Sequence, residues 1–473
     1  MPIRTVLPLI LLLAFVFGRF YDLGIRPPHH DEAVNGWFVD GMFRTGFYKY
    51  DPQNYHGPIY FYFLALAEMI FGRSVQTLRI VTVFFGGLLT FVPFLYRRWI
   101  GPRAAWIAAF VLALSPAVVF YSRYAIHEIP FAFFTALFFY FWLCAREEKF
   151  SWKNLIGLGL SLGMLACLKE NFIIYLACLL IAEVMTRVYG KEWTFPQKYS
   201  LYGLMSLIAF TMVMLVYSAL GRDETGISDF FRAFILWSET GSKGNGHEKT
   251  FDYWIKIFAQ YEWPTLIGVL LTPLALKKKV PQSIRLLSVV SVGTLLAYSI
   301  VKYKTPWCLL CFQWGFVLVL AYWCARIWDR QKVLVITALS IMGLHSAYQA
   351  YEVSYVNVDA EDSYYIYGQT YRDLMPPIEV IIGRVKNNPS LSGTMRISVI
   401  SAYTWPLPFL LGEIKQVGYY NESNVPPVID GDYVFVDQLL EDKFKARLVG
   451  NYSRELVRAR QWASPMVIYT RVR

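Results

Sequence analysis

A short run of ionisable residues, His29-His30-Asp31-Glu32, follows an apolar block at the start of the chain. The Pro27-Pro28 turn before it orients the segment. A carboxylate at the rim of a membrane cavity is partly desolvated, which raises its basicity. Asp31 is therefore a candidate general base that takes a proton from an acceptor hydroxyl, with Glu32 beside it. The alternative is a solvated acidic loop in which both carboxylates stabilise the first turn of a helix.

Two further polar sites interrupt apolar sequence. His56 and Tyr60 flank the turn Gly57-Pro58, where they either bind substrate or form a plain turn with an aromatic anchor. Lys169-Glu170 is either an internal ion pair or the edge of a site. These alternatives stay open on sequence alone.

Cations and acidic residues recur at the ends of other apolar blocks. Arg123 is followed by His127 and Glu128. Ionisable residues at the depth of a membrane segment are costly and indicate function. The alternative is an Arg123 side chain that reaches the membrane interface and pairs with Glu128. Lys302 and Lys304 stabilise the charge that develops on a phosphate leaving group, or they bind anionic lipid headgroups.

The composition shows what must position these residues. Of 473 residues, 56% are hydrophobic and 17% are charged, against about 25% charged in an ordinary soluble domain. The mean hydropathy is +0.38. Apolar blocks of roughly 17 to 22 residues match a helix that crosses a hydrocarbon core of about 30 Å. This pattern excludes a soluble enzyme, a disordered chain and an outer-membrane barrel, and it predicts a polytopic helical membrane protein.

Loop charge predicts the topology. Sixteen Lys and Arg residues fall in one set of alternate short loops and four in the other, if block 57–72 lies at the interface instead of spanning. We therefore expect about eleven transmembrane helices, a cytoplasmic N-terminus and a retained first helix, because the first block lacks a small-residue cleavage site. Loops 22–78 and 221–263 and the region after Tyr351 then share the outer face.

The region after residue 350 has a different composition. Short apolar runs at 397–401, 433–437 and 466–470 predict strands, and periodic stretches near 371–386 and 437–448 predict helices. We expect a soluble, extracytoplasmic α/β domain over 351–473, after a membrane domain over 1–350. None of the six cysteines lies in this region, and the lone Cys308/Cys311 pair lacks the second pair of a zinc site.

The net charge of +11 arises in the membrane half, because the chain from Ser354 onward has 13 basic and 13 acidic residues. No nucleic-acid motif accompanies this charge, so we expect no nucleic-acid partner. Together the residues predict group transfer from a lipid phosphate donor to an acceptor outside the cytoplasm. The alternatives are a transporter or flippase component that moves lipid-linked saccharides without catalysis, and a scaffold that binds partner proteins.

The order and spacing of several motifs resemble those of GT-C membrane glycosyltransferases. These motifs are HHDEA, HGPIYFY, LRIVTVFFGG and SRYAIHEIPFAFF. The chain is most similar to protein O-mannosyltransferases and to the aminoarabinose transferases of lipid A, and KYKTPW is similar to a prokaryotic subfamily named for an association with flippase activity. The resemblance covers about 1–350 and implies an all-α, GT-C type bundle.

The resemblance implies inverting transfer from a polyprenyl-phosphate sugar, a hexose or a pentose. Asp31 would be the base and Glu32 its supporting neighbour. His56 stands where the lipid A enzymes have lysine, and Glu128 stands where an aspartate is more usual. By position, the donor phosphate would contact Arg123, Lys302 and Lys304, whereas His56, Tyr60, His127 and Glu128 would bind substrate.

The resemblance also implies partners and a location. Oligosaccharyltransferases of this superfamily bind a divalent metal but the mannosyltransferase branch does not, so we expect no obligatory metal. Asp31, His127 and Glu128 are candidates for a weak site. The acceptor would be a protein, a glycan or a lipid, and the location the plasma (inner) membrane, among membrane lipids.

Overall fold

A computed structural model describes residues 3–54, 56–147, 151–190, 199–244, 246–277 and 279–472. Four of the sixteen loop cations lie outside these residues, namely Lys149, Lys191, Lys198 and Lys278.

The chain divides into two compact units. One unit comprises 1–23 and 42–356, and the other comprises 24–41 and 357–473. The segment 24–41 therefore groups with the C-terminal region, although the sequence placed it in a loop of the 1–350 domain. Hydrogen bonds between residues 367–370 and residues 27–29 account for this difference.

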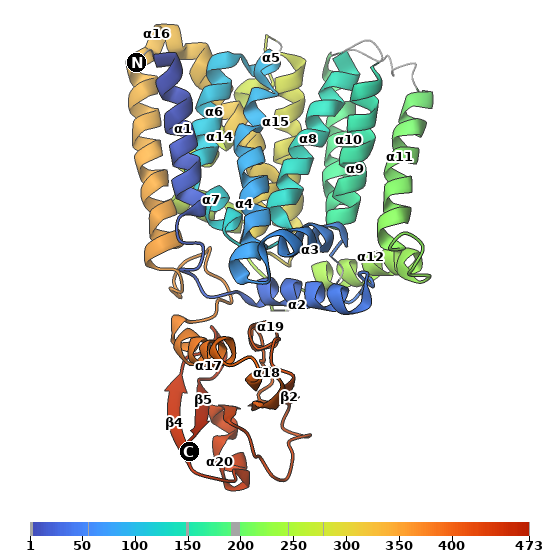
Figure 1. Ribbon diagram of the computed structural model, residues 1–473. Helices are drawn as coiled ribbons and strands as arrows, with labels where there is room; N and C mark the ends of the chain where they lie inside the picture. Colours follow the sequence, from blue (N-terminus) through green and yellow to red (C-terminus); the bar gives the residue numbers. More distant parts are fainter. Residues whose placement is uncertain are drawn as a thin grey trace. The chain divides into compact units, whose positions relative to one another are not determined.

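The first unit is a bundle of helices (Figure 1). Each apolar block of the sequence lies on one or more of them. The helices are α1 (Ile3–Phe20), α3 (Ile59–Phe71), α4 (Val75–Phe91), α5 (Arg97–Ile100), α6 (Pro102–Leu114), α7 (Pro116–Ser122), α8 (Glu128–Glu147), α9 (Trp152–Leu168), α10 (Phe172–Gly190), α11 (Tyr199–Tyr217), α12 (Gly226–Lys243), α13 (Tyr253–Tyr261), α14 (Trp263–Ala275), α15 (Gln282–Ile300) and α16 (Leu310–Tyr351).

Among the described residues, four helical stretches are long and apolar enough to cross a membrane: Val75–Ile100, Glu128–Arg146, Gln282–Ile300 and Pro306–Val356. The bent pair α6 and α7 makes a fifth if it is one span. Several other apolar helices have 10–17 residues, α9 and α14 among them. A multi-pass architecture agrees with the sequence, whereas the count of eleven spans stays a prediction.

A buried carboxylate stabilises the 58° bend between α6 and α7. Glu262 accepts hydrogen bonds from the Ser115 hydroxyl (2.9 Å), the Ala117 backbone N–H (2.7 Å) and the Gln313 amide (2.6 Å). The Ala117 N–H belongs to the first turn of α7 and has no partner within the helix. The bend places the residues after α7, Arg123 to Glu128, at one end of the bundle.

Helix α3 occupies the predicted interfacial block 57–72. Figure 1 shows α3 and α12 lying across one end of the bundle, roughly perpendicular to its long helices, which agrees with an interfacial position. The turn before α3 packs closely on the end of α9, where the Gly57 N–H donates to the Leu168 carbonyl oxygen (3.0 Å). A Cβ atom at Gly57 would overlap the Cys167 carbonyl group, so only glycine fits.

We expect Gly57→Ala to lower the free energy of unfolding by about 1–3 kcal/mol, because backbone must move to admit the methyl group. The measurement is the thermal midpoint of the purified protein in detergent. Gly203→Ala in α11 is the matched control, since no atom lies within 4 Å of the position its Cβ would take. Equal midpoints for the two variants would contradict the close packing at Gly57.

The second unit contains a five-stranded mixed sheet of order β2-β1-β3-β5-β4. The strands are β1 (Arg396–Ile400), β2 (Gln416–Tyr420), β3 (Tyr433–Asp437), β4 (Tyr452–Val457) and β5 (Met466–Arg471). β1 pairs in parallel with β2 and β3, and β5 pairs antiparallel with β3 and β4. Val434, Val436 and Val467 lie in its hydrophobic core. The prediction of an α/β fold here is confirmed.

The three predicted strands are β1, β3 and β5, whereas β2 and β4 were missed. β2 and β4 are the two edges of the sheet. Their residues are largely half-buried or exposed, so they lack the apolar run that marks a buried strand. The predicted helix near 371–386 is α17 (Met375–Asn387), and the stretch 437–448 forms only α20 (Glu441–Phe444) between two short 3₁₀ turns.

Candidate active site

The HHDEA motif forms the beginning of α2 (His30–Thr45). The His29 backbone N–H donates to the Glu32 carboxylate (2.9 Å), and the Asp31 N–H donates to His29 Nδ1 (3.0 Å). This arrangement resembles a capping box, with a histidine ring in place of the usual serine or threonine and the N–H of the second helical residue, in place of the third, as its donor. Glu32 caps the helix as in the alternative from the sequence, but it is fully buried and not part of a solvated loop.

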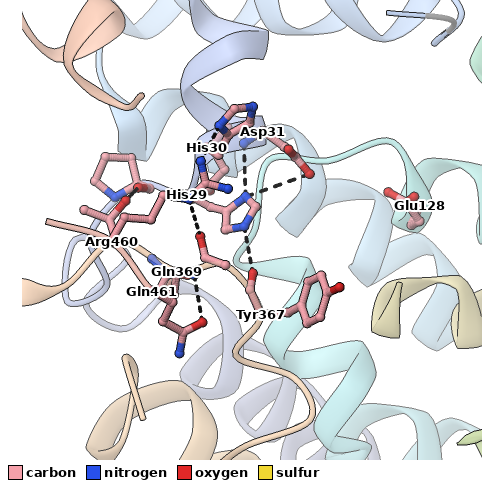
Figure 2. Close-up of polar contacts among 12 residues, drawn as sticks. His29, His30, Asp31, Glu128, Tyr367, Gln369, Arg460 and Gln461 are labelled. Atoms are coloured by element: carbon pink, nitrogen blue, oxygen red, sulfur yellow. Dashed lines mark hydrogen bonds and ion pairs between the residues drawn. The ribbon is translucent and has the colours of Figure 1, made fainter. Parts of the chain in front are cut away.

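The hydrogen bonds of His29 define its protonation state. Nδ1 accepts from the Asp31 N–H, so the proton resides on Nε2, which donates to the Tyr367 carbonyl oxygen at 2.8 Å (Figure 2). Burial lowers the pKa of His29 to about 4, despite the nearby Asp31 carboxylate. His29 is therefore neutral near pH 7, and its 3.8 Å approach to Asp31 Oδ2 is not an ion pair.

The Asp31 carboxylate remains available for chemistry. Its side chain is 39% exposed, and among the described residues its only recorded side-chain contact is the approach to His29. The backbone of Asp31 is held by the cap, whereas its carboxylate makes none of the cap hydrogen bonds. Of the two predicted catalytic residues, Asp31 alone has a carboxylate free to meet a substrate.

His30 contacts the C-terminal region of the same unit. Arg460 Nη1 donates to His30 Nδ1 (2.8 Å), and the His30 ring lies edge-on to Trp405 with centroids 5.8 Å apart. Burial and the Arg460 charge lower the pKa of His30 to about 4, so this imidazole is also neutral at pH 7.

In the first unit, the rings of three predicted substrate-binding residues lie together, with Tyr60 and His127 buried and His56 half-buried. The His127 ring lies 4.8 Å from the His56 ring and 4.3 Å from the Tyr60 ring, and Glu128 begins α8 next to it. Glu128 accepts a charged hydrogen bond from Lys169, and both side chains are more than 90% buried. The sequence left Lys169 as a partner of Glu170 or as the edge of a site. In the structure its ion-pair partner is Glu128.

Arg123 stabilises the end of α1. Its guanidinium donates to the carbonyl oxygens of Arg19 (3.2 Å), Tyr21 (2.6 Å) and Asp22 (2.6 Å) and to the Tyr355 hydroxyl (2.9 Å). It does not pair with Glu128, which was the alternative drawn from the sequence. A donor phosphate would have to displace these bonds, so the geometry favours a structural role for Arg123.

Lys302 and Lys304 differ in exposure. Lys304 is buried, and its ammonium group donates to the Lys249 carbonyl oxygen (3.1 Å) and to that of Val301. Lys302 is exposed. Backbone bonds join this segment to residues 247–249, including Lys304 N–H to the His247 carbonyl oxygen (3.0 Å). Lys302 is therefore the more accessible cation, although Lys304 lies nearer the Thr-Pro-Trp turn.

The described residues contain no group of three His, Cys, Asp or Glu side chains placed to hold a metal ion. Asp31 lies in one unit and His127 and Glu128 in the other, so the weak metal site considered from the sequence is not tested.

Comparison with known proteins identifies the fold. The family model for dolichyl-phosphate-mannose-protein mannosyltransferase matches residues 55–217. An uncharacterized protein of Aquifex aeolicus (strain VF5) is 27% identical over 166 residues, 32% of this chain and 33% of that protein. The match thus spans about a third of that relative. The ArnT of Cupriavidus metallidurans bound to undecaprenyl phosphate is 12% identical and superposes with a TM-score of 0.68, over 98% of this chain and 97% of that one. This chain has the GT-C fold.

Two other solved structures extend the likeness. The oligosaccharyltransferase AglB of Archaeoglobus fulgidus, in complex with an inhibitory peptide and a dolichol-phosphate, has a TM-score of 0.57 at 14% identity, over 94% of this chain and 70% of that one. The arabinofuranosyltransferase AftD from Mycobacteria has a TM-score of 0.54 at 12% identity, over 99% of this chain and 40% of that one. The GT-C resemblance drawn from the motifs is confirmed.

Sequence reasoning missed the residues that hold these side chains. Arg460 lies 430 positions from His30, and Tyr367 lies 338 positions from His29. No local motif marks either of them, because their partners are brought near only by the fold.

Proposed function

We propose that the protein is an inverting glycosyltransferase of the GT-C type. It moves a sugar from a polyprenyl-phosphate donor to a hydroxyl acceptor at the extracytoplasmic face of the plasma (inner) membrane. The observation that carries the proposal is that Asp31 and Glu32 have different roles. The Glu32 carboxylate accepts a hydrogen bond in the helix cap, whereas the Asp31 carboxylate is partly exposed and accepts no hydrogen bond among the described residues.

The chemistry follows from one proton transfer and one displacement. Asp31 takes the proton of the acceptor hydroxyl as its oxygen forms a bond to the anomeric carbon. The bond from that carbon to the phosphate oxygen breaks, and polyprenyl phosphate leaves with the electron pair. Attack from the face opposite the leaving group inverts the anomeric configuration.

Cations stabilise the negative charge that develops on the departing phosphate. Lys302 contacts it most directly because it is exposed, and Lys304 holds the backbone of the same loop. Two structural neighbours are described with polyprenyl phosphates, undecaprenyl phosphate for ArnT and dolichol-phosphate for AglB, which supports such a donor. His56, Tyr60, His127 and Glu128 line the substrate site of the membrane unit, and catalysis needs no resident metal.

The N-terminus is cytoplasmic, and the membrane domain extends to about residue 350. The C-terminal region of 351–473, together with 24–41, lies outside the cytoplasm. The acceptor is a protein, a glycan or a lipid.

The test is donor cleavage by the purified protein in proteoliposomes. A panel of polyprenyl-phosphate hexoses and pentoses is supplied with candidate hydroxyl acceptors, and released polyprenyl phosphate and the new glycoside are quantified by mass spectrometry. We expect both products in equal amounts. Movement of the lipid-linked sugar across the bilayer without either product would refute the proposal and favour a transporter.

A further inference from the structure

Six residues of the C-terminal region surround the segment that precedes Asp31. We call Tyr367–Thr370, Arg460 and Gln461 the clasp. Gln461 N–H donates to the Gln369 carbonyl oxygen (3.0 Å), and Gln369 N–H donates to the Gln461 side chain (3.1 Å). These paired bonds join the two parts of the clasp into one short ladder.

The clasp binds the segment Pro27–His30 through successive residues. Thr370 Oγ1 donates to the Pro28 carbonyl oxygen (2.7 Å), and Gln369 Nε2 donates to that of Pro27 (2.9 Å). The Tyr367 carbonyl oxygen accepts from His29 Nε2. Prolines have no N–H, so their carbonyl oxygens are the only backbone groups through which Pro27 and Pro28 can be held.

Arg460 connects the clasp to the first residue of α2. Its Nε donates to the Gly368 carbonyl oxygen (3.2 Å), and its Nη1 donates to His30 Nδ1 (Figure 2). One guanidinium thus fixes the distance between the clasp backbone and the His30 ring, because its donors lie in a rigid plane. His30 precedes Asp31 directly. The position of His30 therefore determines the position of the Asp31 backbone, from which the carboxylate extends.

Most of these contacts are buried, whereas Arg460 and His30 are half-buried. His29, Gln369, Thr370 and Gln461 are each at most 4% exposed. A buried polar group that loses its partner is costly, so the buried bonds from Gln369 and Thr370 disfavour displacement of Pro27 and Pro28. The bonds involve both main-chain and side-chain atoms at four consecutive positions, which restrains translation as well as rotation of the segment.

We propose that the clasp is a positioning device for Asp31, through which the C-terminal region takes part in sugar transfer without touching the substrate. This inference rests on the proposed function, because it assigns Asp31 as the base. Arg460, Gln369 and Thr370 are positioning residues. The C-terminal region is thereby required for the rate of the chemical step and not for donor binding.

The first test compares Arg460→Ala with wild type. We expect kcat to fall by about 10²-fold, the usual cost of a reacting group displaced by about 1 Å, while KM for the donor stays unchanged. Arg460→Lys should recover part of this loss, since one ammonium group reaches His30 or Gly368 but not both. Arg458→Ala is the matched control, because Arg458 is exposed and pairs with Asp373 instead of the segment.

The second test needs no activity. Hydrogen–deuterium exchange of the amides of residues 29–35 should be faster in Arg460→Ala than in wild type or Arg458→Ala, because the first turn of α2 loses its anchor. Thr370→Val, a nearly isosteric change, should accelerate the same amides if Arg460→Ala folds poorly.

The outcomes separate the two proposals. Unchanged exchange together with wild-type kcat in Arg460→Ala and Thr370→Val would overturn the clasp. If wild type does not cleave the donor, the proposed function fails, and the exchange measurement still decides whether the clasp holds Asp31. If kcat falls as much in Arg458→Ala as in Arg460→Ala, the clasp is also overturned, since Arg458 pairs with Asp373 and not with Pro27–His30.

Discussion

Replacing Asp31 by asparagine should slow sugar transfer by about 10²–10⁴-fold, the usual contribution of a general base. Asparagine keeps the size of the side chain and the backbone N–H that donates to His29, so the helix cap survives. The amide cannot accept the hydroxyl proton, and only the chemical step suffers. The measurement is single-turnover release of polyprenyl phosphate at saturating donor, with the thermal midpoint recorded in parallel.

Glu32→Gln is the control for Asp31→Asn. A glutamine at this position of a capping box accepts the same hydrogen bond from the His29 N–H, so we expect most of the activity to remain. Full activity in Asp31→Asn would remove Asp31 as the base. Equal losses in the two variants, with unchanged thermal midpoints, would mean that Glu32 also takes part in the chemistry.

Much of the membrane unit could be predicted because its signal is local. A run of apolar residues must form a helix in hydrocarbon, where every backbone group needs an internal partner, and each apolar block is helical in the structure. Details that depend on tertiary contacts were not accessible. The α6/α7 bend follows Ser115-Pro116, but its stabilising Glu262 lies 147 residues from Ser115.

The candidate site shows the same contrast between local signals and tertiary contacts. The capping role of Glu32 was an alternative from the sequence, since cap and acceptor are three residues apart. The roles of Arg123 and Lys304 were not predictable, because charge and position identify a cation but not its acceptors. Arg123 donates to backbone carbonyl groups of residues 19–22, which any sequence would offer.

The buried pair of Lys169 and Glu128 leads to the second prediction. Lys169→Met keeps a long aliphatic side chain and removes the charge, which leaves the Glu128 carboxylate buried without its cation. We expect the free energy of unfolding to fall by about 3–5 kcal/mol, the usual cost of breaking a buried ion pair by removing one partner. The measurement is the thermal midpoint in detergent, accompanied by the rate of donor cleavage.

The double variant Lys169→Met/Glu128→Gln decides what the pair does. It removes both charges, and replacement of a whole buried pair is often neutral for stability, so the midpoint should return toward wild type. If Glu128 binds the substrate through its charge, sugar transfer will stay low in this stable double variant. If transfer recovers together with stability, Glu128 serves only as the counter-ion of Lys169, and the substrate contact must come from His56, Tyr60 or His127. A wild-type midpoint in Lys169→Met alone would contradict the buried pair itself.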